Sequence, residues 1–234
     1  QSVADQRLIL QFKPDGIADY MCGSGTTEDV AQKMGIPSHC YDLNRGFDLL
    51  NHEIKERPSF TFAPPYQDII RYAGSQYNAE EIIKKHGFDP RKSDLSRHSN
   101  WEDFLKELDY CTVKQFAALE KGGRMAILGW GYQEKKEANS MILEMAKPGT
   151  IEQIVIKAQY NCVSDKTNIQ ENLFIRIVHE YLLVLRKDHS LIFNFQITRN
   201  IPGDIRDLKT PTWKIIVAAV MEEKKWTGNT RRII

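Results

Sequence analysis

The chain has few cysteines and no apolar run long enough to cross a membrane. Its four cysteines, Cys22, Cys40, Cys111 and Cys162, are far apart and form no Cys-x-x-Cys pair, which argues against a zinc site or a redox motif. We therefore expect no metal, no membrane partner, and a reducing, cytoplasmic setting. The chain begins at Gln1 without a basic-then-apolar leader, so we expect a trimmed or partial polypeptide.

The chain also lacks a strong net charge. Its 32 Lys and Arg residues against 31 Asp and Glu residues give a net charge of +1. This balance argues against a strongly basic nucleic-acid binder but is compatible with a local basic face. The length of 234 residues suits one α/β domain with a proper core and a small appendage.

Short apolar segments alternate with helical segments along most of the chain. The expected strands cover residues 17–21, 38–41, 59–62 and 124–128. The expected helices cover residues 27–34, 48–56, 101–120 and 138–146. Segments 151–160 and 174–186 are rich in β-branched residues and predict a C-terminal antiparallel hairpin. The pattern predicts an α/β, Rossmann-like fold with a mostly parallel twisted sheet and helices on both faces.

The chain divides into one domain and an extension. Residues 1–187 are expected to form the domain, in which the polar segment 72–100 predicts a long loop or small insertion. Pro202, Gly203 and Pro211 mark a linker after residue 187. Residues 188–234 are therefore expected to be a linker and a C-terminal helical extension.

A glycine-rich turn follows the first expected strand, with Gly23 and Gly25 just before the next helix. Glycines let the backbone approach a ligand closely, and the free N–H groups of the following helix point at the turn. Asp42 ends the next strand, where an acid can receive ribose hydroxyls. Because the full G-x-G-x-x-G pattern is absent, a plain strand–helix turn with a surface aspartate is the alternative.

A second motif, Ala63-Pro64-Pro65-Tyr66, directly follows the strand expected at 59–62. Two prolines fix φ and remove two N–H donors, so rigid carbonyl acceptors are left. Tyr66 can stack on a planar ring. These groups suit the exocyclic amino group of a base, although the segment alone would predict only a proline turn that caps a strand.

In combination, these motifs resemble one enzyme family. Residues 22–27 (CGSGTT), 42–44 (DLN) and 64–70 (PPYQDII) are similar to the S-adenosylmethionine-dependent N6-adenine and N4-cytosine DNA methyltransferases. Residues 174–181 (FIRIVHEY) resemble the late strand of that family, and the resemblance covers about residues 1–187. It implies S-adenosyl-L-methionine as the cofactor and double-stranded DNA as the partner. Adenine N6 is favoured over cytosine N4, because Pro-Pro-Tyr is commoner in the adenine group.

The resemblance also implies which residues hold the cofactor. The glycine turn would surround the methionine end, the acid after the second strand would hold the ribose, and the acid in Gly46-Phe47-Asp48 would lie near the adenine ring. The implied cofactor-binding residues are Asp19, Cys22, Gly23, Gly25, Asp42 and Asp48.

The implied target-base site consists of Ala63, Pro64, Pro65 and Tyr66, and Ala63 departs from the family. The family usually has Asp, Asn or Ser there, whose side chain helps to localise the lone pair of the amino nitrogen. Losing one preorganised acceptor typically costs about 10²–10³ in rate. Three interpretations stay open: an inactivating substitution, a naturally weak or non-catalytic copy, or another group that supplies the acceptor.

Basic side chains follow the target-base motif. They would contact phosphates while a base is flipped out, although a charge run is more often a solvated surface. The residues are Arg71, Lys84, Lys85, Arg91, Lys92 and Arg97. The leading hypothesis is a site-specific DNA methyltransferase of the restriction–modification kind. The alternatives are a catalytically impaired subunit that supports a partner or forms a homodimer, and an RNA methyltransferase.

Overall fold

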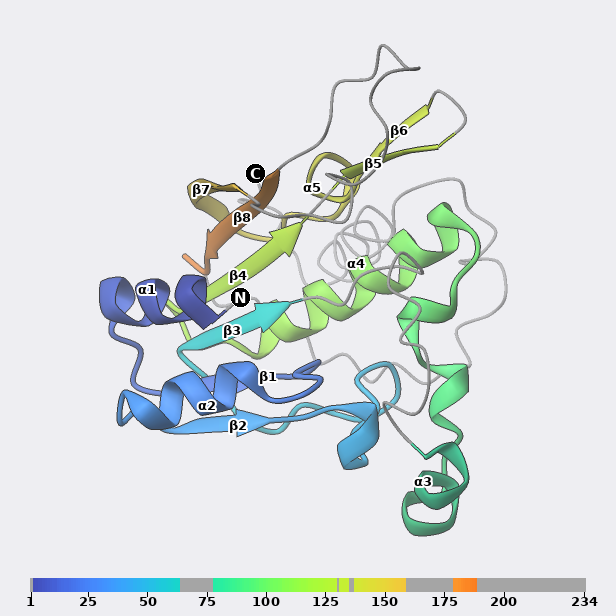
Figure 1. The fold of residues 1–234 in the computed structure, drawn as a ribbon. Coiled ribbons are helices and arrows are strands. Elements are labelled where there is room, and N and C mark those ends of the chain that lie inside the picture. Colours follow the sequence, from blue (N-terminus) through green and yellow to red (C-terminus); the bar gives the residue numbers. More distant parts are fainter. Residues whose placement is uncertain (1, 64–77, 130, 135–136, 159–178, 189–234) are drawn as a thin grey trace, which may run out of the picture.

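The computed structural model describes residues 2–63, 78–129, 131–134, 137–158 and 179–188 (Figure 1). Within them, six strands form a sheet in the order β2-β1-β3-β4-β8-β7, and β5 and β6 form a separate two-stranded ribbon. The strands of the larger sheet are β1 (Ile17–Asp19), β2 (Ser38–Cys40), β3 (Phe60–Ala63), β4 (Arg124–Gly129), β7 (Thr150–Ala158) and β8 (His179–Arg186). The ribbon consists of β5 (Gly131–Glu134) and β6 (Glu137–Ser140).

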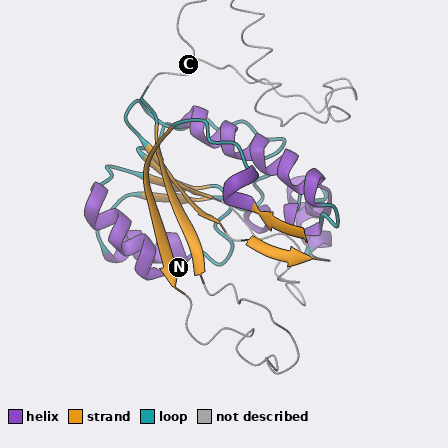
Figure 2. Ribbon diagram, turned by 90° about the horizontal axis from the view of Figure 1, so that it is seen from above, coloured by secondary structure: helices purple, strands orange, loops and turns teal. Residues whose placement is uncertain are grey.

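The strand directions confirm the fold class expected from the sequence. β1, β2, β3 and β4 run parallel, whereas β8 runs antiparallel to both β4 and β7. The helices are α1 (Ser2–Phe12), α2 (Thr26–Lys33), α3 (Ala79–His86), α4 (Trp101–Ala118) and α5 (Met141–Glu144). Helices cover both sides of the sheet (Figure 2), as a mostly parallel sheet requires.

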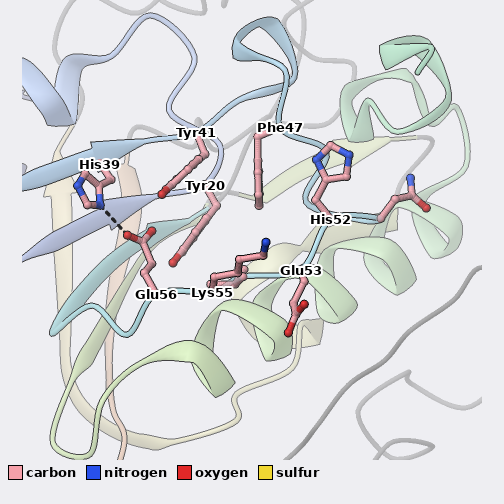
Figure 3. A pocket seen from close by; sticks show the side chains of 10 residues that line it. Tyr20, His39, Tyr41, Phe47, His52, Glu53, Lys55 and Glu56 are labelled. Carbon is pink, nitrogen blue, oxygen red and sulfur yellow. Dashed lines mark hydrogen bonds and ion pairs between the residues drawn. The ribbon is translucent and has the colours of Figure 1, made fainter. Parts of the chain in front are cut away.

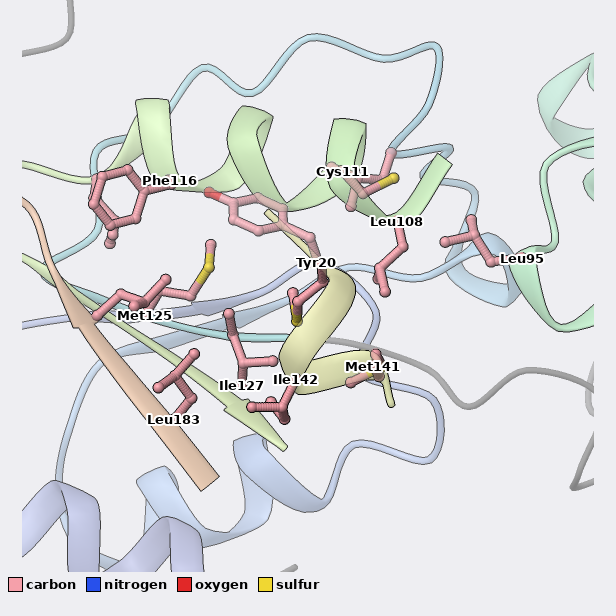
Figure 4. Close-up of a cluster of buried hydrophobic side chains, with 14 of the residues drawn as sticks. Tyr20, Leu95, Leu108, Cys111, Phe116, Met125, Ile127, Met141, Ile142 and Leu183 are labelled. Carbon is pink, nitrogen blue, oxygen red and sulfur yellow. The ribbon is translucent and has the colours of Figure 1, made fainter. Parts of the chain in front are cut away.

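Successive side chains of a strand point to opposite faces of the sheet, and they belong to two buried hydrophobic clusters, one on each face. In β4, Met125 and Ile127 belong to the cluster under α4, whereas Ala126 belongs to the cluster under α1 and α2. Figure 4 shows the first cluster, with Phe116 and Leu108 of α4 above the sheet residues. This period of two fixes which strand side chains reach each face.

The helix predicted at residues 48–56 is wrong. These residues form a turn, and residues 53–58 have no regular secondary structure. The Lys114 Nζ donates to the carbonyl oxygens of Leu49 and His52, both at 2.6 Å, and the Tyr110 hydroxyl donates to Leu50 O at 3.4 Å. Side chains of α4 therefore occupy carbonyl groups that a helix would need for its own bonds.

Two other expectations are corrected. The predicted helix at 138–146 is a strand, β6, followed by the short α5, because Ser140 caps that helix and accepts from Leu143 N at 3.4 Å. Segment 72–100 was predicted to be a long loop or small insertion, and its described part, 78–100, contains α3 and two 3-10 turns, Pro90–Lys92 and Leu95–Arg97. The Asn78 side chain caps the start of α3, and Gly87, in the left-handed region, ends it with a backbone bond to Ile83 O.

The structure also has a helix that the sequence pattern does not predict. α1 is weakly amphipathic, since Val3 and Leu10 are exposed while Leu8 and Ile9 are buried against the sheet. Among the helices in the described part of the chain, none is long and apolar enough to span a bilayer. The linker and helical extension expected at 188–234 lie outside the described residues, apart from Asp188.

Candidate functional site

The glycine turn, Asp42 and Ala63 lie at the carboxyl edge of the parallel strands. Asp19 pairs with Cys40 of β2 on one side and with Phe62 of β3 on the other. Asp42 and Ala63 therefore lie on either side of the turn that leaves β1. The carboxyl edge of a parallel sheet is where open α/β proteins bind ligands. In Figure 1, α3 also lies beyond this edge.

The glycine turn is held in a conformation that favours glycine. Gly23 and Gly25 have φ of 52° and 90°, in the left-handed region. The Gly25 N–H donates to Cys22 O at 2.8 Å and closes the turn. A Cβ atom at Gly25 would lie 2.8 Å from Nη2 of Arg45, so a larger residue would displace that guanidinium. The turn is compact, and α2 starts directly after it.

Asp42 joins the second strand to the glycine turn. Its Oδ2 accepts from the Gly23 N–H at 2.8 Å, and its Oδ1 accepts from the Asn44 N–H at 3.1 Å. Burial raises the pKa of Asp42 above its usual value, and the two backbone bonds partly oppose this rise. Each carboxylate oxygen has a second lone pair, so Asp42 can accept further bonds from a ligand.

Asn44 is a site residue that sequence reasoning missed. Its Nδ2 donates to Gly23 O at 3.4 Å, which brings the side chain onto the glycine turn. Its Oδ1 is enclosed and has no hydrogen-bond partner among the described residues. A ligand with a hydroxyl or amino group can satisfy an enclosed acceptor beside the glycine turn. The position of Asn44, two residues after Asp42, was the available signal.

The Asp19 side chain accepts hydrogen bonds from residues on both sides of the glycine turn. It is buried, accepts from the Thr27 hydroxyl at 2.7 Å and accepts from the Met21 N–H at 3.2 Å. Burial raises the pKa of Asp19 to about 6, against the opposing effect of these two bonds. Asp19 and Asp42 together place two carboxyl groups around the turn, a setting that favours a cationic ligand.

Asp48 is 2% exposed and is bonded within the protein. Its Oδ1 accepts from the N–H groups of Leu50 and Asn51, at 3.0 and 3.3 Å. Its Oδ2 accepts from Asn51 Nδ2 at 2.5 Å and from the Ser93 hydroxyl at 2.6 Å. Asp48 therefore stabilises the protein through hydrogen bonds to neighbouring residues. Its predicted position near the adenine ring of the cofactor stays a prediction.

The target-base motif is described only at its first residue. Ala63 is the last residue of β3 and pairs with Ile127 of β4. Its backbone therefore lies at the carboxyl edge, next to the strand that leads into the glycine turn. Pro64, Pro65, Tyr66 and also Arg71 lie outside the described residues.

The remaining basic residues of the insertion are exposed at the surface. Lys84 and Lys85 lie in the last turn of α3. Arg91 donates to both oxygens of Asp89, at 2.8 and 3.0 Å, and Arg97 donates to Asp94 at 3.2 Å. These acids offset part of the positive charge of the two arginines. Lys92, in the turn after Pro90, is also exposed.

A separate cavity of about 750 Å³ lies beside β2 (Figure 3). Tyr20 and Tyr41 stack in its wall with ring centroids 5.3 Å apart, and the Glu56 carboxylate pairs with Nδ1 of His39 at 2.6 Å. None of the predicted cofactor-binding residues lines this cavity. Within the described residues, no cluster of His, Cys, Asp and Glu could hold a metal ion.

Comparisons with known proteins give only distant structural similarity. No family model matches the chain, and no curated protein matches its sequence. TrmN from Thermus thermophilus is 16% identical with a TM-score of 0.39, over 80% of this chain and 48% of TrmN. A Listeria monocytogenes protein described as a putative class I S-adenosylmethionine-dependent methyltransferase is 14% identical with a TM-score of 0.38, over 84% and 61%.

A third similar structure is an rRNA methylase from Streptococcus thermophilus. It is 12% identical with a TM-score of 0.32, over 81% of this chain and 98% of the methylase. The chain spans about half the length of TrmN and less than two thirds of the Listeria protein. These TM-scores are too low to assign the chain a cofactor or a substrate.

Proposed function

We propose that this chain is an S-adenosylmethionine-dependent methyltransferase that acts on the exocyclic amino group of a base in DNA, with adenine N6 favoured. The observation that carries the proposal is the bond between Asp42 and the Gly23 N–H, at 2.8 Å. This bond links the glycine turn to an aspartate that is placed to accept the hydroxyls of a ribose. Both lie at the carboxyl edge of a mostly parallel sheet. The sequence resemblance assigns the same two groups to the cofactor.

The residues around the glycine turn fit this cofactor. Asn44 Oδ1 is an enclosed acceptor without a partner among the described residues, and Asp42 has free lone pairs. These acceptors match the ribose hydroxyls. S-adenosylmethionine supplies a methyl group on a positively charged sulfur, and the carboxyl groups of Asp19 and Asp42 around the glycine turn attract a cation when they are ionised.

The target amino group would lie beyond the end of β3. Ala63 ends β3, the strand that pairs with β1, and β1 leads into the glycine turn that would hold the methyl donor. The Ala63 side chain has no acceptor atom, so it cannot bind an amino hydrogen as Asp, Asn or Ser would. We expect methyl transfer by this chain to be slow for that reason.

Ala63 also supports a second candidate function. A chain that keeps the cofactor site and lacks one acceptor can act as a subunit that binds cofactor or DNA without turnover. Such a subunit would support a catalytic partner or a second copy of itself. The two candidates differ in one measurable property, because only the enzyme transfers methyl groups by itself.

The experiment is methyl transfer from tritiated S-adenosylmethionine to unmethylated duplex DNA, with a transfer-RNA and ribosomal-RNA mixture as the parallel substrate. Nucleoside analysis of the product then identifies the base. The proposal predicts label in DNA, on N6-methyladenine. Cofactor binding without label in either substrate would favour the non-catalytic subunit, and label confined to RNA would overturn the choice of DNA.

A further inference from the structure

The strongest unexplained feature is the buried carboxylate of Asp48, which links two separate parts of the chain. Asn51 Nδ2 donates to Asp48 Oδ2 at 2.5 Å and to the Ser93 hydroxyl oxygen at 3.2 Å. The Ser93 hydroxyl in turn donates to Asp48 Oδ2 at 2.6 Å. We call these three residues the Asp48 cluster. Asp48 and Ser93 are 2% and 4% exposed, whereas Asn51 lies at the surface, so the bond between Asp48 and Ser93 is the buried part of the cluster.

A second contact holds the same two parts together. A Cβ atom at Gly46 would lie 2.3 to 2.6 Å from three atoms of the His86 ring, so the ring packs directly against the Gly46 backbone. The rings of His52 and Phe88 also meet edge to face, with centroids 5.4 Å apart. Residues 42–52 and residues 86–93 therefore contact at three places.

Each of the two parts carries residues of a different predicted site. The first carries Asp42 and Asn44, and the Phe47 N–H donates to Asp42 O at 3.0 Å, so the loop is one bonded unit. The second carries two of the predicted DNA-contacting cations, Arg91 and Lys92, just before Ser93, and Lys84 and Lys85 come just before its first residue, His86. The Asp48 cluster thus connects residues 42–52, which we call the cofactor loop, to the insertion.

We infer that Asp48 is a positioning residue that couples cofactor binding to DNA binding through Ser93. This inference rests on the proposed function. A buried carboxylate needs all of its donors, since an unpaired buried charge is costly. A cofactor that orders residues 42–52 therefore also favours the hydrogen bond from Ser93 to Asp48. That bond in turn fixes the position of Arg91 and Lys92, which precede Ser93. By linkage, DNA must then raise cofactor affinity by the same factor.

The test compares S-adenosylhomocysteine affinity, measured by calorimetry, with and without saturating unmethylated duplex DNA. In the unchanged chain we expect DNA to tighten binding by about fivefold or more, the lower range of measured couplings. Ser93→Ala should bring this ratio close to one while each ligand still binds. A general loss of stability would instead weaken binding with and without DNA alike.

Ser96→Ala is the matched control. The Ser96 hydroxyl donates to Asp94 Oδ1 at 2.6 Å in the same segment and is not part of the Asp48 cluster. It should leave the ratio unchanged. Asp48→Asn is the second variant if Ser93→Ala does not fold, because it keeps the shape and one acceptor oxygen but lowers the strength of the donated bonds.

Two failures are distinguishable. If the unchanged chain binds only one of the two ligands, or neither, the proposed function fails and the coupling fails with it. If it binds both and Ser93→Ala keeps the full ratio, the inference about Asp48 is overturned while the proposed function stands. Amide hydrogen exchange at residues 43–52 gives a ligand-free check, since it should be faster in Ser93→Ala than in Ser96→Ala.

Discussion

The Asp42 carboxylate, at the end of β2, accepts a hydrogen bond from the Gly23 N–H at 2.8 Å and so joins two motifs that lie apart in the sequence. We expect Asp42→Ala to weaken S-adenosylhomocysteine binding by about tenfold or more, the scale of losing hydrogen bonds to a charged group. Calorimetry measures the change. Asp42→Asn keeps an acceptor for Gly23 and should lose less. Unchanged affinity in Asp42→Ala would remove the ribose role.

Cofactor binding should depend on pH through Asp19, whose pKa burial raises to about 6. Above this pKa its carboxylate is charged and attracts the positively charged sulfur of S-adenosylmethionine. As the pH falls through the pKa, protonation removes that attraction. The affinity for S-adenosylmethionine should therefore fall relative to that for S-adenosylhomocysteine, whose sulfur is uncharged. The ratio of the two affinities should lose this pH dependence in Asp19→Asn, and a flat ratio in the unchanged chain would contradict the account.

A buried carboxyl group away from the site gives a stability prediction. Asp109 is 3% exposed, and its Oδ1 accepts from the Ala146 N–H at 2.6 Å. Burial raises its pKa from 3.8 to about 7, although the Ala146 bond and Lys147 oppose the rise. The folded state thus binds the proton more tightly than the unfolded state. Stability from this group is present below pH 3.8 and is lost as the pH rises toward 7.

Asp109→Asn keeps an acceptor for Ala146 and removes the titration. Its free energy of unfolding relative to the unchanged chain should rise between about pH 4 and pH 8, by about 1.4 kcal/mol for each unit by which the two pKa values differ. Urea unfolding at several pH values measures this. A difference that does not vary with pH would show that Asp109 titrates normally in the folded protein.

The sequence predicted the sheet better than its connections. The short apolar strands around Ala18, Thr61 and Ala126 lie where expected, because burial on both faces leaves a continuous apolar signal. The turn at 48–52 could not be predicted, since Lys114 of α4, far along the chain, takes its carbonyl groups. The α3 helix did have a local signal, because Asn78 stands three residues before Glu81.

In the candidate site, too, the sequence predicted local features but not contacts between distant residues. Gly23, Gly25 and Asp42 could be predicted from the sequence. Positive φ angles favour glycine, and an acid at the end of a strand is a local pattern. The bond between Asp48 and Ser93 joins residues 45 positions apart, and no local pattern encodes such a pair. The sequence did place Asn44 close to Asp42, but it could not show that Asn44 Oδ1 is enclosed, because an enclosed acceptor is a property of packing.

DNA affinity should depend on the cations of the insertion. Arg91 and Arg97 are paired with Asp89 and Asp94, so neutralising Lys84 and Lys85 to Gln should reduce the salt dependence at least as much as neutralising the two arginines. Log affinity falls with log salt, and each phosphate that the protein no longer neutralises makes this slope less steep by about 0.9. Fluorescence anisotropy with a labelled duplex at several salt concentrations measures the slope.

The matched control neutralises two exposed lysines at the opposite, amino edge of the sheet. Lys33 ends α2, and Lys121 precedes β4. Changing both to Gln alters the net charge by the same amount and should leave the slope nearly unchanged. Equal slopes in the Lys84/Lys85 variant and the unchanged chain would move DNA recognition elsewhere, with the basic residues at 224–232 as the next candidates.

The most direct test of the central claim is the rate of methyl transfer from tritiated S-adenosylmethionine to unmethylated DNA, measured for the unchanged chain and for Ala63→Asp. The substitution supplies a side-chain acceptor at the end of β3. The account predicts a rise of at least about tenfold, a conservative fraction of what one preorganised acceptor contributes. A fast unchanged chain that Ala63→Asp slows would contradict it, as would the absence of label from DNA with both proteins.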